Sequence, residues 1–428
     1  MRGVFCGDWH YGLSVEDLDR TPDVHKAVEF IIDEAIRVEA DFVSVGGDLT
    51  DNNTPLPDHI ALLIQVFNRL EEAEIPTFVL RGNHEAISAP GRLWALTPLE
   101  RVGYENVHFI TEPKLINYED VTFLFLPHAT RSQAIEHGFK TAQEFIDAKA
   151  EELLKKVSKT CTVISHYNVN GARAGTEAMM LRQTDLQLPA IVMRSPKVEQ
   201  IVNSHIHTAQ TKGKIIMPGS RVCTDFGDLD SAKGFLIGDY DGGWEFETIN
   251  TPASPMQSVE IDLVGESPEG IRKTIEAVKK TVVKDSIVKI RVMVEEEKVG
   301  FVDFDKLRGE FAKKARFVKQ IDRIITRKRQ VRDPNQKPSL KPIDAVKQYL
   351  DFRSPEGKDR KHHLAMRVMS GEELGIKDSG SSFSNQTAAI ASLDSALDEL
   401  ADDGEIDFDN DVIPDFSGEA IDGPSLDL

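Results

Sequence analysis

Five apolar runs in the first half of the chain each end in a short polar block, and this ordered pattern constrains the fold more than any other feature. The blocks supply, in chain order, Asp8 and His10, then Asp48, then Asn83 and His84, then His166, and finally His205 and His207. One such block alone is typical of an ordinary turn or a surface histidine. Five in order predict polar side chains gathered at one sheet edge, where sites form in open α/β folds.

Short β-type runs alternate with helix-like segments over residues 1–250. Amphipathic helices are predicted at 21–38 and 59–72, and a strand at 77–80 follows the second helix. This alternation, without a long series of hairpins, indicates an α/β fold with substantial parallel pairing. Strands become more frequent toward the end of this region, so we expect a second sheet packed on the first in a sandwich flanked by helices.

A chain of 428 residues is too long for one core and predicts several domains. A Pro- and Ser-containing stretch at 251–255 is the expected linker after the first domain. The predicted parts are a sandwich domain at 1–250, a small α+β domain of β-α-β-α-β order at 256–332, a linker with a helical segment at 333–377, and an acidic, largely disordered tail at 378–428.

The net charge of −20 lies mostly in the tail, because the residues from Gly371 onward hold 16 acids and one lysine. Residues 306–347 are basic, with 14 Lys and Arg against four acids. The overall acidity therefore does not exclude a polyanionic substrate. The basic run is equally typical of an exposed charged helix face.

No apolar run approaches the roughly 20 residues of a membrane helix, and the N-terminus lacks a signal-peptide pattern. We therefore expect a cytoplasmic protein without membrane association. Cys6, Cys161 and Cys223 are odd in number and have no CxxC spacing, so buried reduced thiols are predicted rather than a disulfide framework or a zinc knuckle.

The polar blocks carry the donor types of a metal centre. Asp8 and His10 are two residues apart, as are His205 and His207, so each pair points to one side of an extended chain. Asp48 follows two glycines that let the backbone approach a cation, and a carboxylate bridges two ions. Asp, His and Asn donors without Cys suit Mn²⁺, Fe²⁺ or Zn²⁺. Two such ions about 3.5–4 Å apart hold a phosphoryl group and activate a water.

His84 adjoins Asn83 but is not needed as a ligand, so it is free to act as a general acid or to hold phosphate. The remaining histidines are interpreted as ordinary ones, although His128 follows a strand and could line the site. They are His25, His59, His108, His128, His137, His362 and His363.

The blocks resemble the motifs of the calcineurin-like metallophosphoesterases, which read Asp-x-His, Gly-Asp, Gly-Asn-His, His and His-x-His. The resemblance implies two divalent ions, with Mn²⁺ expected. It assigns one ion to Asp8, His10, Asp48 and His207, and the other to Asp48, Asn83, His166 and His205. It also implies that His84 is the catalytic histidine and that the acid after it, here Glu85, supports it.

Two further blocks resemble the SbcD-type nuclease subunits of this superfamily. They are Gly7–Gly12 and the stretch 218–235, which contains Pro-Gly-Ser, Asp-Phe-Gly-Asp and Lys-Gly-Phe. The resemblance implies exonuclease and endonuclease activity on double- and single-stranded DNA ends, in repair and recombination. It also implies a DNA-capping domain at 256–332, a homodimer, and an SbcC-type coiled-coil ATPase that binds a helix at 343–350.

Two positions depart from the family pattern. Ser204 stands where the family has Gly, and we expect this small change to be tolerated. Glu85 replaces an Asp, which bears on the pKa of His84 rather than on metal binding. Two other functions stay open, namely a phosphoesterase for small substrates or phosphoproteins and a non-catalytic scaffold of the same fold. For the helix at 343–350, packing on its own domain is the alternative to partner binding.

Overall fold

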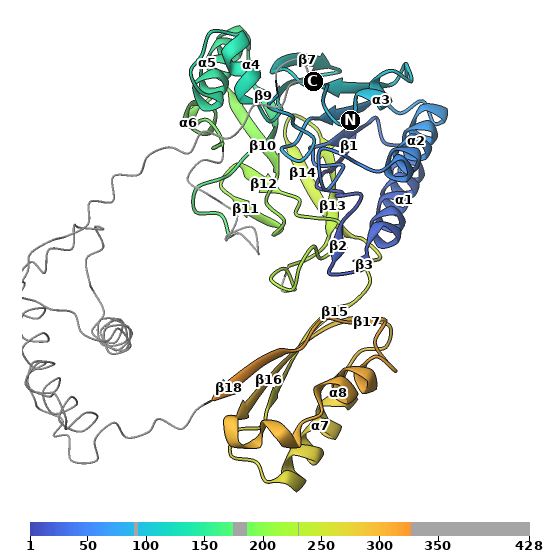
Figure 1. Cartoon of the computed structure of the whole chain (residues 1–428). Helices are drawn as coiled ribbons and strands as arrows, with labels where there is room; N and C mark the ends of the chain where they lie inside the picture. The colour runs from blue at the N-terminus through green and yellow to red at the C-terminus, as the bar shows by residue number, and fades with distance from the viewer. Residues whose placement is uncertain (90–92, 174–185, 230, 327–428) are drawn as a thin grey trace, which may run out of the picture. The chain divides into compact units, whose positions relative to one another are not determined.

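The computed structural model describes residues 1–89, 93–173, 186–229 and 231–326, and it confirms an α/β architecture with two packed sheets (Figure 1). The first sheet has the spatial order β14 (Trp244–Asn250), β13 (Gly234–Tyr240), β1 (Arg2–Cys6), β4 (Phe42–Val45), β5 (Thr77–Leu80) and β6 (Val107–Ile110). The second has the order β11 (Gln210–Lys212), β12 (Ile215–Met217), β10 (Val198–Ser204), β9 (Cys161–His166), β8 (Val121–Leu126) and β7 (Lys114–Tyr118).

The facing surfaces of the two sheets share a core rich in aromatic side chains. The ring of Phe42 on the first sheet meets the ring of Phe123 on the second edge-on, with 5.3 Å between centroids. Phe5 contacts Phe42 in the same way at 5.3 Å. Edge-to-face pairs of this kind add stability beyond the area that they bury. This core holds the two sheets together and so brings their strand ends to one place.

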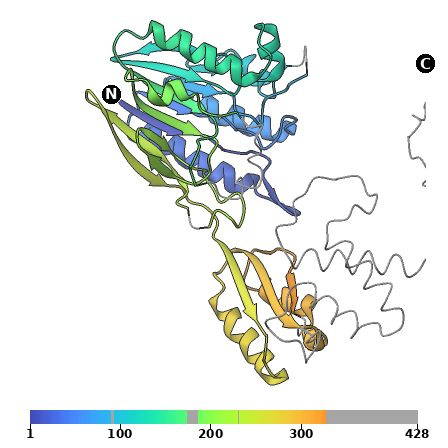
Figure 2. The same cartoon turned by 90° about the vertical axis from the view of Figure 1, so that its left-hand side faces the viewer.

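Helices cover the outer faces of both sheets, so the layers run helix, sheet, sheet, helix (Figure 2). The larger helices are α1 (Thr21–Arg37), α2 (Pro57–Glu72) and α5 (Ala142–Lys156), and the short ones are α3 (Thr97–Glu100), α4 (Arg131–Glu136) and α6 (Ala190–Arg194). In α1, Val24, Val28, Ile31 and Ile32 recur at helical spacing and are fully buried. The helix predicted at 21–38 therefore forms for the expected reason.

Parallel pairing aligns the strands that carry the polar blocks. In the first sheet β1 pairs with β4 and β4 pairs with β5, and in the second β9 pairs with β10, all in parallel. In the second sheet the register places Ser204 opposite His166. Because parallel strands end at the same edge, the five blocks lie at one end of the sandwich.

Residues 256–326 form a third sheet with a hydrophobic core of its own. Its strands are β15 (Met256–Asp262), β16 (Ile287–Glu295), β17 (Phe317–Val318) and β18 (Asp322–Thr326), and its helices are α7 (Pro268–Thr281), η2 (Glu296–Phe301) and α8 (Phe304–Phe311). β15, β17 and β18 all pair with β16 in parallel. The chain order is the predicted β-α-β-α-β, closed by a second short strand.

Several elements have no counterpart in the sequence prediction. They include α5, β6, β7, β13, β14 and a small hairpin of β2 (Ser14–Val15) and β3 (Leu18–Asp19). The helix predicted at 343–350 and the regions 333–377 and 378–428 lie outside the described residues. Among the described residues, no helix is long and apolar enough to cross a membrane. The three cysteines are free, and Cys6 and Cys161 are buried as predicted, but Cys223 is only half-buried.

Candidate metal centre

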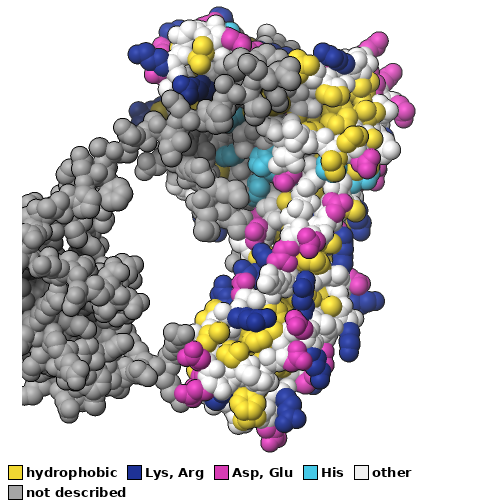
Figure 3. Space-filling view, viewed as in Figure 1, with side chains coloured by type: hydrophobic (Ala, Val, Ile, Leu, Met, Phe, Trp, Pro, Cys, Tyr) yellow, Lys and Arg dark blue, Asp and Glu magenta, His cyan; other side chains and the backbone are white. Residues whose placement is uncertain are grey.

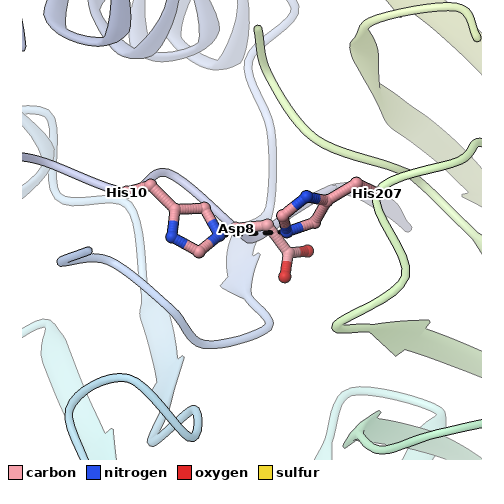
Figure 4. A group of neighbouring side chains, drawn as sticks. All are labelled: Asp8, His10 and His207. Atoms are coloured by element: carbon pink, nitrogen blue, oxygen red, sulfur yellow. Dashed lines mark hydrogen bonds between the residues drawn. The ribbon is translucent and has the colours of Figure 1, made fainter. Parts of the chain in front are cut away.

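The first donor group joins the β1 loop to the β10 loop. Ligand atoms of Asp8, His10 and His207 lie within 4.8 Å of one another (Figure 4). The Nε2 atoms of His10 and His207 face each other at 3.1 Å. One oxygen of Asp8 accepts the main-chain N–H of His205 at 2.9 Å, whereas Oδ2 is buried without a hydrogen-bond partner in the described part of the chain. Leaving a carboxylate oxygen buried and unpaired costs free energy, which a cation at this point removes.

The second donor group joins β4, β5, β9 and β10. Ligand atoms of Asp48, His166 and His205 lie within 4.8 Å of one another. The Oδ1 atom of Asn83 lies 2.9 Å from Nε2 of His166 and 2.9 Å from Nδ1 of His205. Oδ2 of Asp48 lies 3.1 Å from Nε2 of His166. The four predicted ligands of the second ion therefore converge.

The electrostatics of this group suit a cation. Burial lowers the pKa of His166, but the nearby Asp48 and Asp8 carboxylates outweigh it and raise that pKa to about 9. The pKa of His205 is lowered to about 3, mainly by burial and by His166, so its ring is neutral, as a ligand must be. A site that stabilises the positive charge of a buried imidazolium at His166 also stabilises a metal cation. The residues therefore fit the divalent ion that the sequence implies.

In the structure, Asp48 lies in the second donor group, with His166 and His205. Its Oδ1 accepts the main-chain N–H of His84 at 2.9 Å, and its Oδ2 lies near both His166 and the ring of His84. Burial opposes ionisation of Asp48, but His166 and His84 hold its pKa well below the usual range. That Asp48 also binds the first ion, and so bridges the two ions, stays a prediction.

Four of the predicted ligands have an unusual backbone conformation. The φ angles are 49° for Asp8, 57° for His10, 52° for Asp48 and 81° for His205. Non-glycine residues seldom occupy this left-handed region, and such strain concentrates at functional sites. The surrounding fold holds four residues in costly conformations at the ends of the strands, two of them in each donor group.

Two glycines make these loops sterically possible. A Cβ on Gly82 would overlap the main-chain nitrogen of Asp48. Gly47 has φ +104°, and a Cβ there would lie 2.8 Å from the Cα of Gly82. The loops after β4 and β5 therefore touch backbone to backbone, which only glycine allows.

His84 lies beside the donor groups and is open to solvent. Its Nδ1 donates to the main-chain carbonyl of Asp51 at 2.6 Å, and its ring packs edge-on against His10 with centroids 4.7 Å apart. Burial lowers the pKa of His84, but Asp48 and the Asp51 carbonyl outweigh it, so the net shift is upward. Its side chain is 34% exposed, whereas that of His166 is fully buried. Figure 3 shows histidine side chains reaching the surface on this face of the sandwich.

Glu85 is fully buried and is bonded to backbone rather than to the ring of His84. Oε1 accepts the N–H of Thr50 at 2.9 Å, and Oε2 accepts those of Gly82 at 2.9 Å and Asp48 at 3.2 Å. Burial and the Asp48 charge raise the pKa of Glu85 to about 7, against the Thr50 N–H, which lowers it. These contacts indicate a positioning role for the loops that present Asp48 and His84.

Asp51 is a site residue that the sequence prediction missed. Its carboxylate lies 3.2 Å from Nδ1 of His10, close enough to pair with it but without the alignment of a full hydrogen bond. With His10 and His84 it forms a third cluster of possible ligand atoms. The available signal was its position three residues after Asp48 in the same loop.

Ser204 occupies space that two facing glycines leave open. A Cβ on Gly46 or on Gly7 would overlap the Oγ atom of Ser204. The serine is 2% exposed and so fills a gap between the β1 and β4 loops. The Ser-for-Gly difference is therefore accommodated without displacing either loop.

The other histidines that the structure describes, His25, His59, His108, His128 and His137, lie outside the donor groups. His362 and His363 lie outside the described residues. The half-buried ring of His128 stacks on Tyr167 with centroids 6.5 Å apart, and His166 is among the charges that affect the pKa of His128. Burial first, and then His166, lower the pKa of His128 to about 3. His25 instead pairs with the hydroxyl of Tyr11 at 2.9 Å. His128 thus borders the site, as the sequence suggested.

Comparison with known proteins gives a matching family and a distant relative. Residues 1–209 match the model of the calcineurin-like phosphoesterase family. The SbcD subunit of the nuclease SbcCD from Staphylococcus epidermidis is 24% identical over 283 residues, which cover 61% of this chain and 72% of that protein.

Solved structures give weaker similarities. A dimetal phosphatase from Danio rerio has a TM-score of 0.37 and 13% identity, covering 58% of this chain and 98% of that one. The phosphoesterase YfcE from E. coli has a TM-score of 0.27 and 18% identity, covering 56% and 90%.

Proposed function

Residues 1–209 belong to the calcineurin-like phosphoesterase family, and from this premise we propose that the chain is a two-metal phosphodiesterase that cuts DNA ends. The observation that carries the proposal is the convergence of two donor groups on neighbouring loops, with ligand atoms of each within 4.8 Å. A phosphodiester has a low reactivity that calls for charge neutralisation and an activated water. Paired divalent ions, here proposed to be Mn²⁺, supply both when bound.

The proposed ligands divide as the two groups do. Asp8, His10 and His207 would hold one ion, and Asn83, His166 and His205 would hold the other, with Asp48 shared between them. Each side chain comes from a strand end or the loop after it, and the paired strands place these at the same edge. The protein therefore supplies a rigid cradle, and no large movement is needed to assemble it.

His84 is the proposed catalytic residue, acting as general acid for the leaving oxygen. Its Nδ1–H is held by the Asp51 carbonyl, and Nε2 lies 3.9 Å from Oδ2 of Asp48, on the side of the donor groups. The Nε2 proton would therefore be the one given to the leaving oxygen. In the metal-free chain, burial lowers the pKa of His84, but Asp48 and the Asp51 carbonyl outweigh it and raise that pKa, which favours the protonated form that a general acid needs. Partial exposure lets it reach a bound substrate.

Two features support DNA as the substrate. The curated relative is named as part of a nuclease. The basic residues that the structure describes between 306 and 326 lie on and beside α8 and the third sheet, and their surface carries Lys and Arg among acidic side chains (Figure 3). Lys and Arg that contact phosphates release counterions, which favours binding. We accordingly propose residues 256–332 as a DNA-capping domain.

The test is cleavage of linear duplex, hairpin and single-stranded DNA by the full chain with Mn²⁺. We expect activity that Asp8→Ala and His84→Ala abolish. Unchanged activity in either variant would overturn the proposal. Turnover of an aryl phosphate without DNA cleavage would instead identify a small-substrate phosphoesterase. Absence of Mn²⁺ binding in calorimetry would indicate a non-catalytic scaffold.

The proposed partners are a second copy of the chain and an SbcC-type coiled-coil ATPase that binds within residues 333–377. This assignment rests on the sequence resemblance. Deletion of residues 340–375 should abolish co-purification with a coiled-coil ATPase encoded by a neighbouring gene. The Mn²⁺-dependent nuclease activity should be retained. Retained co-purification contradicts the assignment.

A further inference from the structure

Behind the ligand His207 lies a hydrogen-bonded relay, formed by Thr224 and Asp228, that leads away from the metal centre. Nδ1 of His207 lies 3.0 Å from the hydroxyl of Thr224, and that hydroxyl lies 2.5 Å from Oδ2 of Asp228. Asp228 also accepts the main-chain N–H of Thr224 at 3.4 Å. Neither Thr224 nor Asp228 belongs to a donor group among the described residues.

The chemistry of the three groups gives the relay a direction. An ionised carboxylate only accepts hydrogen bonds, so the single proton of the Thr224 hydroxyl goes to Asp228. The hydroxyl oxygen then has lone pairs for the Nδ1–H of His207. With its proton on Nδ1, the neutral His207 ring presents an unprotonated Nε2, which is the atom that faces Nε2 of His10.

Two of the other ligand rings have simpler partners beside Nδ1. Nδ1 of His166 donates to the carbonyl of Gly46 at 2.7 Å, and Nδ1 of His10 lies beside the carboxylate of Asp51. A carbonyl only accepts, so Gly46 selects the Nδ1–H tautomer of His166 by itself, whereas the Asp51 carboxylate lies near Nδ1 of His10 without an aligned hydrogen bond. A hydroxyl donates or accepts, so Thr224 selects this tautomer only because Asp228 takes its proton.

Lys233 completes the arrangement. Its ammonium group lies 3.6 Å from Oδ2 of Asp228 and donates to the main-chain carbonyl of His207 at 3.2 Å. The Asp228 side chain is fully buried, so this cation offsets a charge that solvent cannot reach. The lysine thereby holds both ends of the relay, the backbone of His207 and the carboxylate of Asp228.

We propose that Thr224 and Asp228 are positioning residues that set the tautomer and ring orientation of His207 and so tune the affinity for one of two metal ions. The inference rests on the metal centre of the proposed function. Outer partners of metal ligands change metal affinity by about 10- to 100-fold when removed. The effect falls on one ion, because the relay contacts His207 and no ligand of the second group among the described residues.

The experiment compares Mn²⁺ binding by the full chain in calorimetry and electron paramagnetic resonance. Thr224→Val keeps the side-chain shape but removes the hydroxyl, and we expect one of two sites to weaken by about 10- to 100-fold and the spin-coupled pair to be lost at limiting Mn²⁺. Thr224→Ser should restore both. Thr248→Val, on the exposed edge strand β14, is the matched control and should behave as the wild type.

A second readout uses the metal-free protein. Nitrogen-15 chemical shifts should place the proton of His207 on Nδ1 in the wild type and in Thr224→Ser, and as a mixture in Thr224→Val. If Thr224→Val does not fold, Asp228→Asn serves in its place, because its amide N–H₂ competes as a donor to the Thr224 oxygen.

The outcomes separate the two proposals. Wild-type protein that binds no Mn²⁺ contradicts the proposed function, while the tautomer measurement still decides the relay. Two sites of wild-type affinity and an unchanged His207 tautomer in Thr224→Val overturn the inference and leave the proposed function standing.

Discussion

The main-chain carbonyl of Asp51 lies 2.6 Å from Nδ1 of His84, and its side chain pairs at 3.2 Å with Nδ1 of His10. One residue thus contacts both the proposed catalytic histidine and a proposed ligand, through chemically different groups. The two contacts can be separated by mutation, because a side-chain substitution leaves the carbonyl in place.

Asp51→Ala should weaken metal binding rather than catalysis. The His84 contact is retained through the backbone, whereas His10 loses the carboxylate beside Nδ1. We expect the Mn²⁺ concentration for half-maximal activity to rise about 10- to 100-fold, with kcat little changed at saturating Mn²⁺. A Mn²⁺ titration of activity measures both quantities. A large fall in kcat at saturation contradicts this separation.

His84→Gln should stop hydrolysis while both ions stay bound. Loss of a general acid lowers the rate by about 10²- to 10⁴-fold. Single-turnover cleavage measures the rate, and calorimetry counts the bound Mn²⁺. His137→Gln is the matched control, because His137 lies outside the donor groups of the described residues and its side chain is 41% exposed. Loss of a metal ion in His84→Gln would assign this histidine to the ligands instead.

Glu85→Gln should destabilise the loops around Asp48. The amide group cannot accept hydrogen bonds at both ends, so at least one of three buried backbone N–H groups loses its partner. The expected cost is about 2 kcal/mol. Thermal unfolding of the metal-free protein gives the change. Glu100→Gln, at the end of α3, is the control for removing a glutamate charge near the surface. An unchanged midpoint for Glu85→Gln rules out the positioning role.

Gly82→Ala should disrupt the metal centre more than the addition of a single methyl group suggests. The added Cβ would overlap the backbone of Asp48, and backbone cannot move aside as a side chain does. We expect loss of Mn²⁺ binding at the second site and a lower unfolding midpoint. Gly309→Ala in α8 has no atom within 4 Å of the new Cβ and should be neutral or slightly stabilising. Normal Mn²⁺ binding by Gly82→Ala contradicts the close approach of the two loops.

Asp23 should make stability depend on pH below about 4. Burial raises the pKa of this α1 carboxylate, but contacts with Ser254, Arg20 and Arg316 outweigh burial and lower it below 3.8. A folded-state pKa below the unfolded value stabilises the fold above the unfolded pKa, and this stability is lost as pH falls through the folded one.

The matching variant is Asp23→Asn, which leaves the buried Arg20 without its ion-pair partner at 2.6 Å. We expect a loss of about 3 kcal/mol at pH 7. The difference in unfolding midpoint from the wild type should shrink as pH falls below about 4. A difference that is constant between pH 7 and pH 3 shows that the charge of Asp23 does not matter.

Residue order along the chain was enough to predict two packed sheets with polar blocks at one edge, whereas the division of their side chains into two donor groups came from the family resemblance. The spacing of Asp8 and His10, and of His205 and His207, follows from strand geometry, and parallel pairing places the block after each strand at a common edge. Features of this local kind can be predicted from residues that are close together in the sequence. The sequence prediction missed the hairpin of β13 and β14. β13 also pairs with β1, which lies far away in the chain, and no local pattern indicates such long-range pairing.

The sequence by itself predicted which side chains are candidate metal ligands and roughly where the strands that carry them end. Only the tertiary structure decided which groups contact these side chains and their loops and hold them in position. Asp51 pairs with His10, Glu85 binds the backbone of three residues, and Thr224 and Asp228 line up behind His207. These partners lie on separate loops, and hydrogen bonds select partners by distance and angle in space. Such contacts arise when the two sheets pack together, and no repeating pattern in the sequence predicts them.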